Sequence, residues 1–418
     1  MDWYQRVAKT YESSWQTIGI ADALSLTLSP LEKDENFLRA IGYFWSDALN
    51  CFFFGHAPMT PTLMDVAMIL GFDVQSSCPS AFSLSECTHK IVDKAATRNW
   101  TQYMAFHAKT HGPVDKREHT AFLNLWLDHF LFCGSSLAPT KNYLNLGHAL
   151  ADGHRFAMGK LFLGTLYRSL SLNTSRLLNG EAVKGGGPWW FLQLWGKLYF
   201  RQDIQDMPSL TSLRFPDATG KLIRSTSFGQ TLYRLSGHRF EKQEMIAWFR
   251  TFYQGPIYPS FFPYSAPIEF ENPSFLRLDD FADDEETRLV FSVVIRPCLL
   301  PVGMSTGNRT IRPGYEAYQP VIAARQFGLN QISPDFFIHR VMEHRADLPD
   351  GVTALRAYTL FSDLDLPIPV DLDLTPTALG FEEWWQTWRS HLFHHAVGPM
   401  LCSIDSSYTP TPEEVITK

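Results

Sequence analysis

The chain has 418 residues, of which 45% are hydrophobic and 19% are charged, and its formal net charge is −7. This composition excludes a largely disordered chain, and the length suggests two or three core-forming units. A net acidic chain has no overall attraction to phosphate backbones, so a nucleic-acid site would have to be a local patch. The six cysteines are scattered, which favours reduced thiols in an intracellular protein.

The longest stretch without Asp, Glu, Lys or Arg covers residues 251–268 and contains one glycine and four prolines, so it predicts no membrane span. An acidic run follows directly. Residues 269–286 hold eight acidic side chains against one arginine, so the whole formal net charge lies in this run. The remaining chain is formally neutral, and its total charge therefore does not exclude a local DNA-binding face.

Helical spacing of apolar residues is clearest at residues 60–71. Leu63, Val66, Ala67 and Leu70 follow the i, i+3, i+4, i+7 pattern of one helix face. Thr60 or Thr62 is expected as the N-cap, and Gly71 at the C-terminal end. The segment predicts one amphipathic helix.

Further elements are expected along the chain. Residues 121–130 and 146–170 carry helical stripes, the second broken near Gly153 or Gly159. Pro188 is placed to open a helix that runs to residue 199. The β-branched residues 289–295 predict a strand, residues 352–361 another, and residues 381–395 a last amphipathic helix with three tryptophans. Trp126, Trp195 and Trp385 are expected in the core.

These elements predict an α+β fold that is predominantly α-helical, with a helical N-terminal lobe packed on a mixed C-terminal lobe of few short strands. The expected divisions are an N-terminal extension at 1–36, the helical lobe at 37–205, the mixed lobe at 206–400 and a C-terminal tail at 401–418. A Pro/aromatic and acidic insertion is expected at 251–286.

The known chemical motifs are not matched. The run from Gly153 to Lys160 has five residues between its glycines, and Leu161 stands where a P-loop needs Ser or Thr. The His and Cys residues lack the spacing of a zinc site, and the acidic run lacks the pattern of a calcium loop. We therefore predict no catalytic residues, no metal and no cofactor.

A DNA-binding alternative comes from the same helix. Residues 60–71 are similar to the first helix and turn of a helix-turn-helix reader. The second helix is poorly supported, because Pro79 interrupts it and only Lys90 and Lys94 are basic up to residue 96. An RNA- or DNA-binding module that uses segment 60–96 is therefore the second hypothesis.

Five ordered blocks resemble a known family, the plant mobile domain, also called the aminotransferase-like plant mobile domain. The matching positions are Trp45, Thr60, Leu63, Asp65, Val66, Leu70, Gly71, Phe122, Leu125, Trp126, Ala151, Gly153, Leu166, Tyr167, Gln193, Trp195, Arg325, Gln326, Phe327, Gly328 and Gln331. The aminotransferase label is not supported by the residues, because no lysine has a recognisable pyridoxal-phosphate context. An enzyme is the third hypothesis, with Arg325 and Gln326 as its first candidates.

The resemblance implies a nuclear, transposon-related protein, similar to the MAINTENANCE OF MERISTEMS group. It implies roles in transposable-element silencing, gene expression, genome stability and meristem maintenance, together with a phosphatase-7-like partner. The nuclear placement comes from the resemblance alone, because the chain has no cluster of Lys and Arg typical of an import signal.

The leading hypothesis is a non-enzymatic protein-interaction domain. Its partner surface is expected on the Pro/aromatic and acidic segment. The residues assigned to that surface are Tyr258, Phe261, Phe262, Tyr264, Asp283 and Asp284.

Overall fold

The computed structural model describes residues 2–28, 32–81, 83–88, 98–178, 186–200, 214–216, 221–224, 227–235, 240–254, 264, 285–304, 313–329, 331 and 379–416. Most of these residues are helical, and the strands among them are short and antiparallel. The predicted fold class is confirmed. No helix in these ranges is long and apolar enough to cross a membrane.

Three helices open the chain: α1 (Asp2–Thr17), α2 (Ala21–Leu26) and α3 (Glu35–Gly42). Trp3, Val7 and Trp15 of α1 are buried, and the helix packs against α5 (Trp100–Ala108) and α6 (Lys116–Leu125). The residues predicted as an N-terminal extension therefore include a helix that contributes to the core.

A small antiparallel sheet follows, formed by β1 (Trp45–Ser46), β2 (Cys51–Phe54) and β3 (Ala57–Met59). Side chains alternate between the two faces of a strand. Phe52 and Phe54 accordingly join the main core, while Cys51 and Phe53 join a second cluster beneath α15 (Leu379–Leu392). Both faces of β2 are therefore covered.

Helix α4 (Leu63–Leu70) confirms the helix, the N-cap and the glycine stop predicted within residues 60–71, but the predicted amphipathic character is wrong. Thr62 is its N-cap and forms a capping box with Asp65, while Gly71 ends the helix in the left-handed region at φ 66°. All eight residues of α4 are buried. Such a helix lies inside the protein and presents no side chain to a partner.

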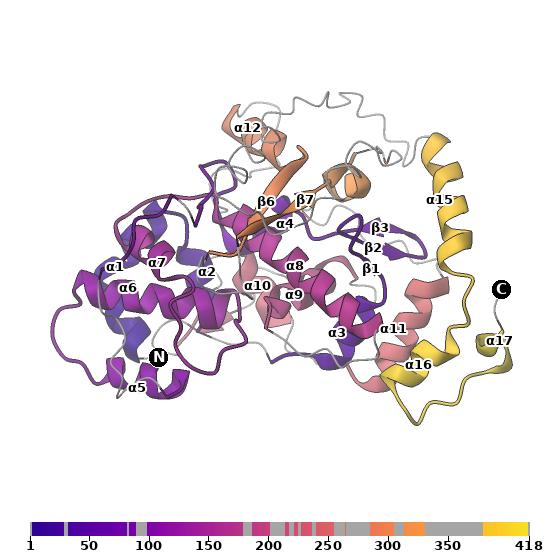
Figure 1. Ribbon diagram of the computed structural model, residues 1–418, viewed down its shortest axis with the longest axis horizontal. Coiled ribbons are helices and arrows are strands. Elements are labelled where there is room, and N and C mark those ends of the chain that lie inside the picture. Colours follow the sequence, from indigo (N-terminus) through magenta and orange to yellow (C-terminus); the bar gives the residue numbers. More distant parts are fainter. Residues whose placement is uncertain are drawn as a thin grey trace.

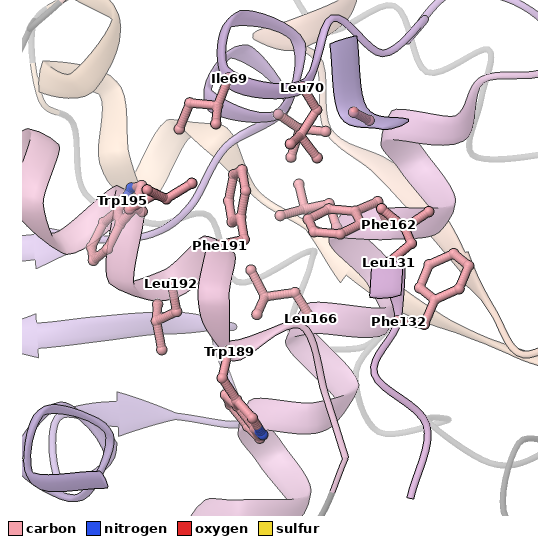
Figure 2. Packing of buried hydrophobic residues seen from close by; sticks show 14 of the residues in the cluster. Ile69, Leu70, Leu131, Phe132, Phe162, Leu166, Trp189, Phe191, Leu192 and Trp195 are labelled. Atoms are coloured by element: carbon pink, nitrogen blue, oxygen red, sulfur yellow. The ribbon is translucent and has the colours of Figure 1, made fainter. Parts of the chain in front are cut away.

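The helical half continues beyond α6 with a π-helix, η2 (Trp126–Leu131), and then α7 (Leu144–Ala151), α8 (Met158–Leu178) and α9 (Trp189–Tyr199). The predicted break near Gly153 is confirmed, because this glycine lies between α7 and α8 at φ 82°. Figure 2 shows side chains of α4, α8 and α9 packed together, with Phe162, Phe191 and Trp195 among them.

The second half contains shorter elements. They are β4 (Arg214–Pro216), β5 (Leu222–Arg224), α10 (Phe228–Leu235), α11 (Lys242–Gln254), α12 (Glu285–Val294), β6 (Cys298–Val302), β7 (Gly314–Tyr318), the 3-10 helix η6 (Pro320–Phe327), α15, α16 (Gly398–Ile404) and α17 (Pro412–Val415). Strands β4 and β5 pair with each other, as do β6 and β7. The predicted helix at 381–395 is confirmed by α15.

The strand predicted at residues 289–295 is wrong, because most of that segment belongs to helix α12. Val290 and Val294 are buried and stand one helical turn apart, whereas Leu289 is 55% exposed. Contacts on one helix face thus outweigh the strand preference of the β-branched residues. The strand predicted at 352–361 lies outside the described residues.

One hydrophobic cluster runs from Trp3 to Ile404 and includes residues on both sides of the predicted lobe boundary. The predicted C-terminal tail also joins the fold. Leu401 and Ile404 are buried, and Arg250 of α11 forms an ion pair with Glu414 at 2.7 Å. Figure 1 shows α16 next to α11 at the end of the molecule opposite α5 and α6.

Candidate functional site

Several residues of the family resemblance meet in a buried polar junction, formed by Thr60, Thr62, Asp65, Tyr167 and Gln326. They come from the turn between β3 and α4, from the first turn of α4, from α8 and from η6. Gln326 Oε1 accepts a hydrogen bond from the Thr60 N–H at 2.8 Å, and its Nε2 donates to the Thr60 carbonyl at 2.9 Å. One side-chain amide therefore pairs with both the N–H and the carbonyl of the buried Thr60, in the way that a neighbouring β-strand pairs with the backbone of a strand.

Asp65 is the charged member of the junction and is 0% exposed. One carboxylate oxygen accepts from the Thr62 backbone N–H at 2.7 Å and from the Thr62 hydroxyl. The other accepts from the Tyr199 hydroxyl at 2.8 Å and the Tyr264 hydroxyl at 2.6 Å. Burial raises the pKa of Asp65, and these hydrogen bonds oppose that effect. With every contact internal, this carboxylate is a structural anchor and is closed to substrate.

Tyrosine hydroxyls hold the turn that leads into α4. Tyr167 donates to the Pro61 carbonyl at 2.6 Å and accepts from the Thr60 hydroxyl at 2.9 Å. Tyr318 of β7 donates to the Val294 carbonyl and accepts from the Leu63 N–H at 3.2 Å. Each hydroxyl donates its one proton and accepts one hydrogen bond, and both partners are protein groups.

The remaining resemblance residues also have structural positions. Leu63, Val66, Leu70, Phe122, Leu125, Trp126, Leu166, Trp195 and Phe327 are buried in the core. Trp45 Nε1 donates to the Ser171 hydroxyl, and Gln193 bridges the Asp34 N–H and the Glu32 carbonyl. Gly71 and Gly328 both end helices with φ in the left-handed region. Ala151 is the last residue of α7, and Gly153 follows it.

Arg325 and Gln331 flank the end of η6. The Arg325 guanidinium lies 5.3 Å from the centre of the Phe381 ring, and Gln331 Nε2 donates to the Val321 carbonyl at 2.7 Å. The pairing of Gln326 with Thr60 joins η6 to the N-terminal half, and the contact of Arg325 with Phe381 joins η6 to α15. The segment around Arg325 is therefore a joint between parts of the fold.

The partner surface predicted on the Pro/aromatic and acidic segment needs correction at Tyr264. This tyrosine is only 2% exposed, because its hydroxyl reaches inward to the buried Asp65 carboxylate. Its ring also packs on Phe228 with centroids 5.5 Å apart. Tyr258, Phe261, Phe262, Asp283 and Asp284 lie outside the described residues.

The helix-turn-helix alternative is not supported by the described part of segment 60–96. Helix α4 exposes no side chain, and residues 72–81 and 83–88 contain no helix. A groove-reading helix must present exposed polar side chains to base edges. Lys90 and Lys94 lie outside the described residues.

A cleft that the sequence did not reveal lies between α1, α5, α6 and η2. We call it the aromatic cleft; its volume is about 580 Å³, and it is lined by Asp2, Trp3, Tyr4, Thr27, Leu28, Thr101, Met104, Ala105, Ala108, Phe122, Leu125, Trp126, His129 and Phe130. Helices α1, α5 and α6 gather at the left-hand end of the molecule in Figure 1. Most of the lining is apolar, as is usual for binding sites.

The floor of the aromatic cleft is formed by Trp3, Phe122 and Trp126, which are all at most 5% exposed. Tyr4 and Phe130 are half-buried and stand at its walls. The Trp3 ring packs edge-on against Phe122 at 5.3 Å, and its Nε1 donates to Glu118 at 2.9 Å. Glu118 also pairs with Arg6, so α1 is tied to α6 beside the cleft.

The π-helix η2 supplies Trp126, His129 and Phe130 to the cleft. Its wider turn is seen in the hydrogen bond from the Phe132 N–H to the Leu127 carbonyl, five residues back. π-Turns inside helices are rare and often occur at functional sites. His129 stacks on Trp100 at 5.2 Å, and burial lowers its pKa, so the ring is neutral at pH 7.

Sequence reasoning missed the cleft because its parts are far apart in the chain. The sequence predicts Trp126 as a core residue, which its burial confirms, but it predicts residues 1–36 only as an extension of the fold. The available signals were the aromatic pair Trp3 and Tyr4 and the apolar spacing of α1.

The model of the plant mobile domain matches residues 19–386. No curated protein and no solved structure matches the chain. Within the described residues, no group of three or more His, Cys, Asp or Glu side chains could hold a metal ion.

Proposed function

Because the chain belongs to the plant mobile domain family, a transposon-related domain, we propose that it works as a non-enzymatic protein-interaction domain in the nucleus. In this proposal it acts in transposable-element silencing, gene expression and genome stability, together with a phosphatase-7-like partner. The aromatic cleft is its partner-binding surface.

The cleft is the observation that carries the proposal. Trp and Tyr dominate the energetics of protein interfaces, where a few aromatic anchors in dry pockets supply most of the binding free energy. Here three buried rings form a floor beneath the half-buried rings of Tyr4 and Phe130. A partner side chain that enters the cleft would bury apolar surface on several sides.

The polar junction supports a non-catalytic role. Asp65, Tyr167 and Gln326 have the functional groups that an active site could use, but all are buried and bonded to protein atoms. A catalytic group must reach the reacting atoms of a substrate. The plant mobile domain is not a known catalytic family, and the motif residues are accounted for by their structural contacts.

Co-expression with a phosphatase-7-like protein tests the proposal. Size-exclusion chromatography should show the two chains eluting together in one peak, ahead of either protein alone. Separate elution at micromolar concentration would contradict the proposed partner.

A further inference from the structure

We propose that the aromatic cleft binds a methylated ammonium group on a peptide side chain, that is, a trimethyllysine of a partner protein. This proposal rests on the proposed function, since it takes the cleft to be a protein-binding surface. It adds the chemistry of the side chain that the cleft accepts.

Aromatic side chains from separate segments line the cleft. Trp3 and Tyr4 come from α1, Phe122 from α6, and Trp126 and Phe130 from η2. The negative face of an aromatic ring attracts a cation within about 6 Å of its centre, and clusters of such rings recognise quaternary ammonium groups. A methylated ammonium group also loses less hydration than a bare one when it enters an apolar site.

The charges of the lining select the same class of ligand. Asp2 is the only residue with a formal charge among those that line the cleft, and no Lys or Arg is present there. Burial lowers the pKa of His129, so its ring carries no charge at pH 7. A cation therefore meets one carboxylate and no opposing positive side chain, whereas an anion meets no complementary charge.

The size of the cleft fits a side chain together with adjoining peptide. Its volume of about 580 Å³ lies within the roughly 300–1,000 Å³ of ordinary ligand sites. Met104, Ala105 and Ala108 of α5 offer an apolar wall for the methylene stem of a lysine. The long stem would pack there while the ammonium group lies against the rings.

Helix α1 completes the cleft from outside the residues matched to the family. The residues matched to the family begin at 19, whereas Asp2, Trp3 and Tyr4 precede them. The contacts of Glu118 with Trp3 and Arg6 hold α1 in place over α6. Without this helix the cleft would lose one wall and its only carboxylate.

The test is a tryptophan-fluorescence titration of the full chain with short peptides of neutral sequence. One carries trimethyllysine, one unmodified lysine, and one a neutral isostere in which a tert-butyl group replaces the trimethylammonium group. We expect the trimethyllysine peptide to bind about tenfold more tightly than the other two. Phosphocholine, the same cation on a lipid headgroup, should bind more weakly than the peptide.

Two variants examine the site with matched controls. Asp2→Asn and Phe130→Leu should each weaken binding of the trimethyllysine peptide severalfold. Glu383→Gln, at an exposed acid of α15, and Phe106→Leu, at an exposed phenylalanine of α5, should leave it unchanged. Circular dichroism checks that all four remain folded.

Equal binding of the trimethyllysine peptide and its neutral isostere would overturn the proposal, and so would tighter binding of phosphocholine or no binding of any peptide. The proposed function fails separately, because co-elution with the phosphatase-7-like protein is a different measurement. A stable complex without trimethyllysine binding would remove only this inference.

Discussion

Gln326 and Thr60 are 266 residues apart, yet one side-chain amide pairs with both backbone groups of the other residue, at 2.8 and 2.9 Å. The contact joins η6 to the turn that starts α4. Together with the bonds of Asp65 and Tyr167 to the same turn, it makes the family-motif residues a joint of the fold.

Removing the Gln326 side chain tests this joint. In Gln326→Ala the Thr60 N–H and carbonyl remain buried without partners, so the free energy of unfolding should fall by about 2–4 kcal/mol. Urea denaturation followed by tryptophan fluorescence measures the loss. The same substitution at the exposed Gln386 of α15 should change stability by less than about 0.5 kcal/mol. Equal effects at the two positions would argue against a joint at Gln326.

Asp65→Asn should also destabilise the protein, by about 2–4 kcal/mol, although it keeps the shape of the side chain. Both oxygens of Asp65 accept two hydrogen bonds each, and an asparagine amide would turn its NH₂ group toward donors on one side. Thermal unfolding should show a lower midpoint. An unchanged midpoint would mean that the carboxylate is not needed as an acceptor on both sides.

A glycine pair tests how closely α8 approaches β6. A Cβ at Gly164 would lie 2.5 Å from the Pro301 carbonyl oxygen, whereas one at Gly380 of α15 would meet nothing within 4 Å. Gly164→Ala should therefore cost about 1–3 kcal/mol. Gly380→Ala should be neutral or stabilise by up to about 1 kcal/mol, because alanine is the better helix former. A harmless Gly164→Ala would disprove the close packing.

His119 should make stability depend on pH. It is buried, it stacks on Tyr11 at 3.8 Å, and its Nε2 accepts from Trp15 at 2.9 Å. Burial lowers its pKa from 6.5 to about 4. The unfolded chain therefore binds the extra proton first, and stability falls as the pH drops from about 6.5 to 4, by up to about 3 kcal/mol.

His119→Gln removes this titration while it keeps an acceptor for Trp15. Urea midpoints measured between pH 7 and pH 4.5 should then vary less than in the unsubstituted protein. His111→Gln, at an exposed histidine, should preserve the original pH dependence. Parallel curves for the unsubstituted protein and His119→Gln would contradict the assignment.

Local rules predicted the elements whose signals are local. Helix α4 could be predicted from its Thr62 cap, its apolar spacing and the glycine at 71. The break between α7 and α8 could be predicted from Gly153. The β-branched residues predict a strand where helix α12 lies. The prediction fails because the burial of Val290 and Val294 depends on neighbours that are distant in the sequence. The contact of Tyr264 with Asp65 spans 199 residues, and no sequence pattern marks it.

The aromatic cleft could not be predicted from local patterns either, because it depends on contacts between segments that are distant in the sequence. It needs α1 to dock on α6, and it needs the π-turn of η2 to bring Trp126, His129 and Phe130 into its lining. A π-helix has no distinct apolar period in so short a segment. The sequence predicted Trp126 as core but not the opening above it.

The most direct test of the interaction account is the elution of the complex with the phosphatase-7-like protein when the cleft is blocked. Phe130→Arg places a positive charge at its wall, and Phe106→Arg places one on the exposed surface of α5. The account predicts that size-exclusion chromatography shows co-elution for the unsubstituted chain and Phe106→Arg but separate peaks for Phe130→Arg. Co-elution of a folded Phe130→Arg variant would contradict it.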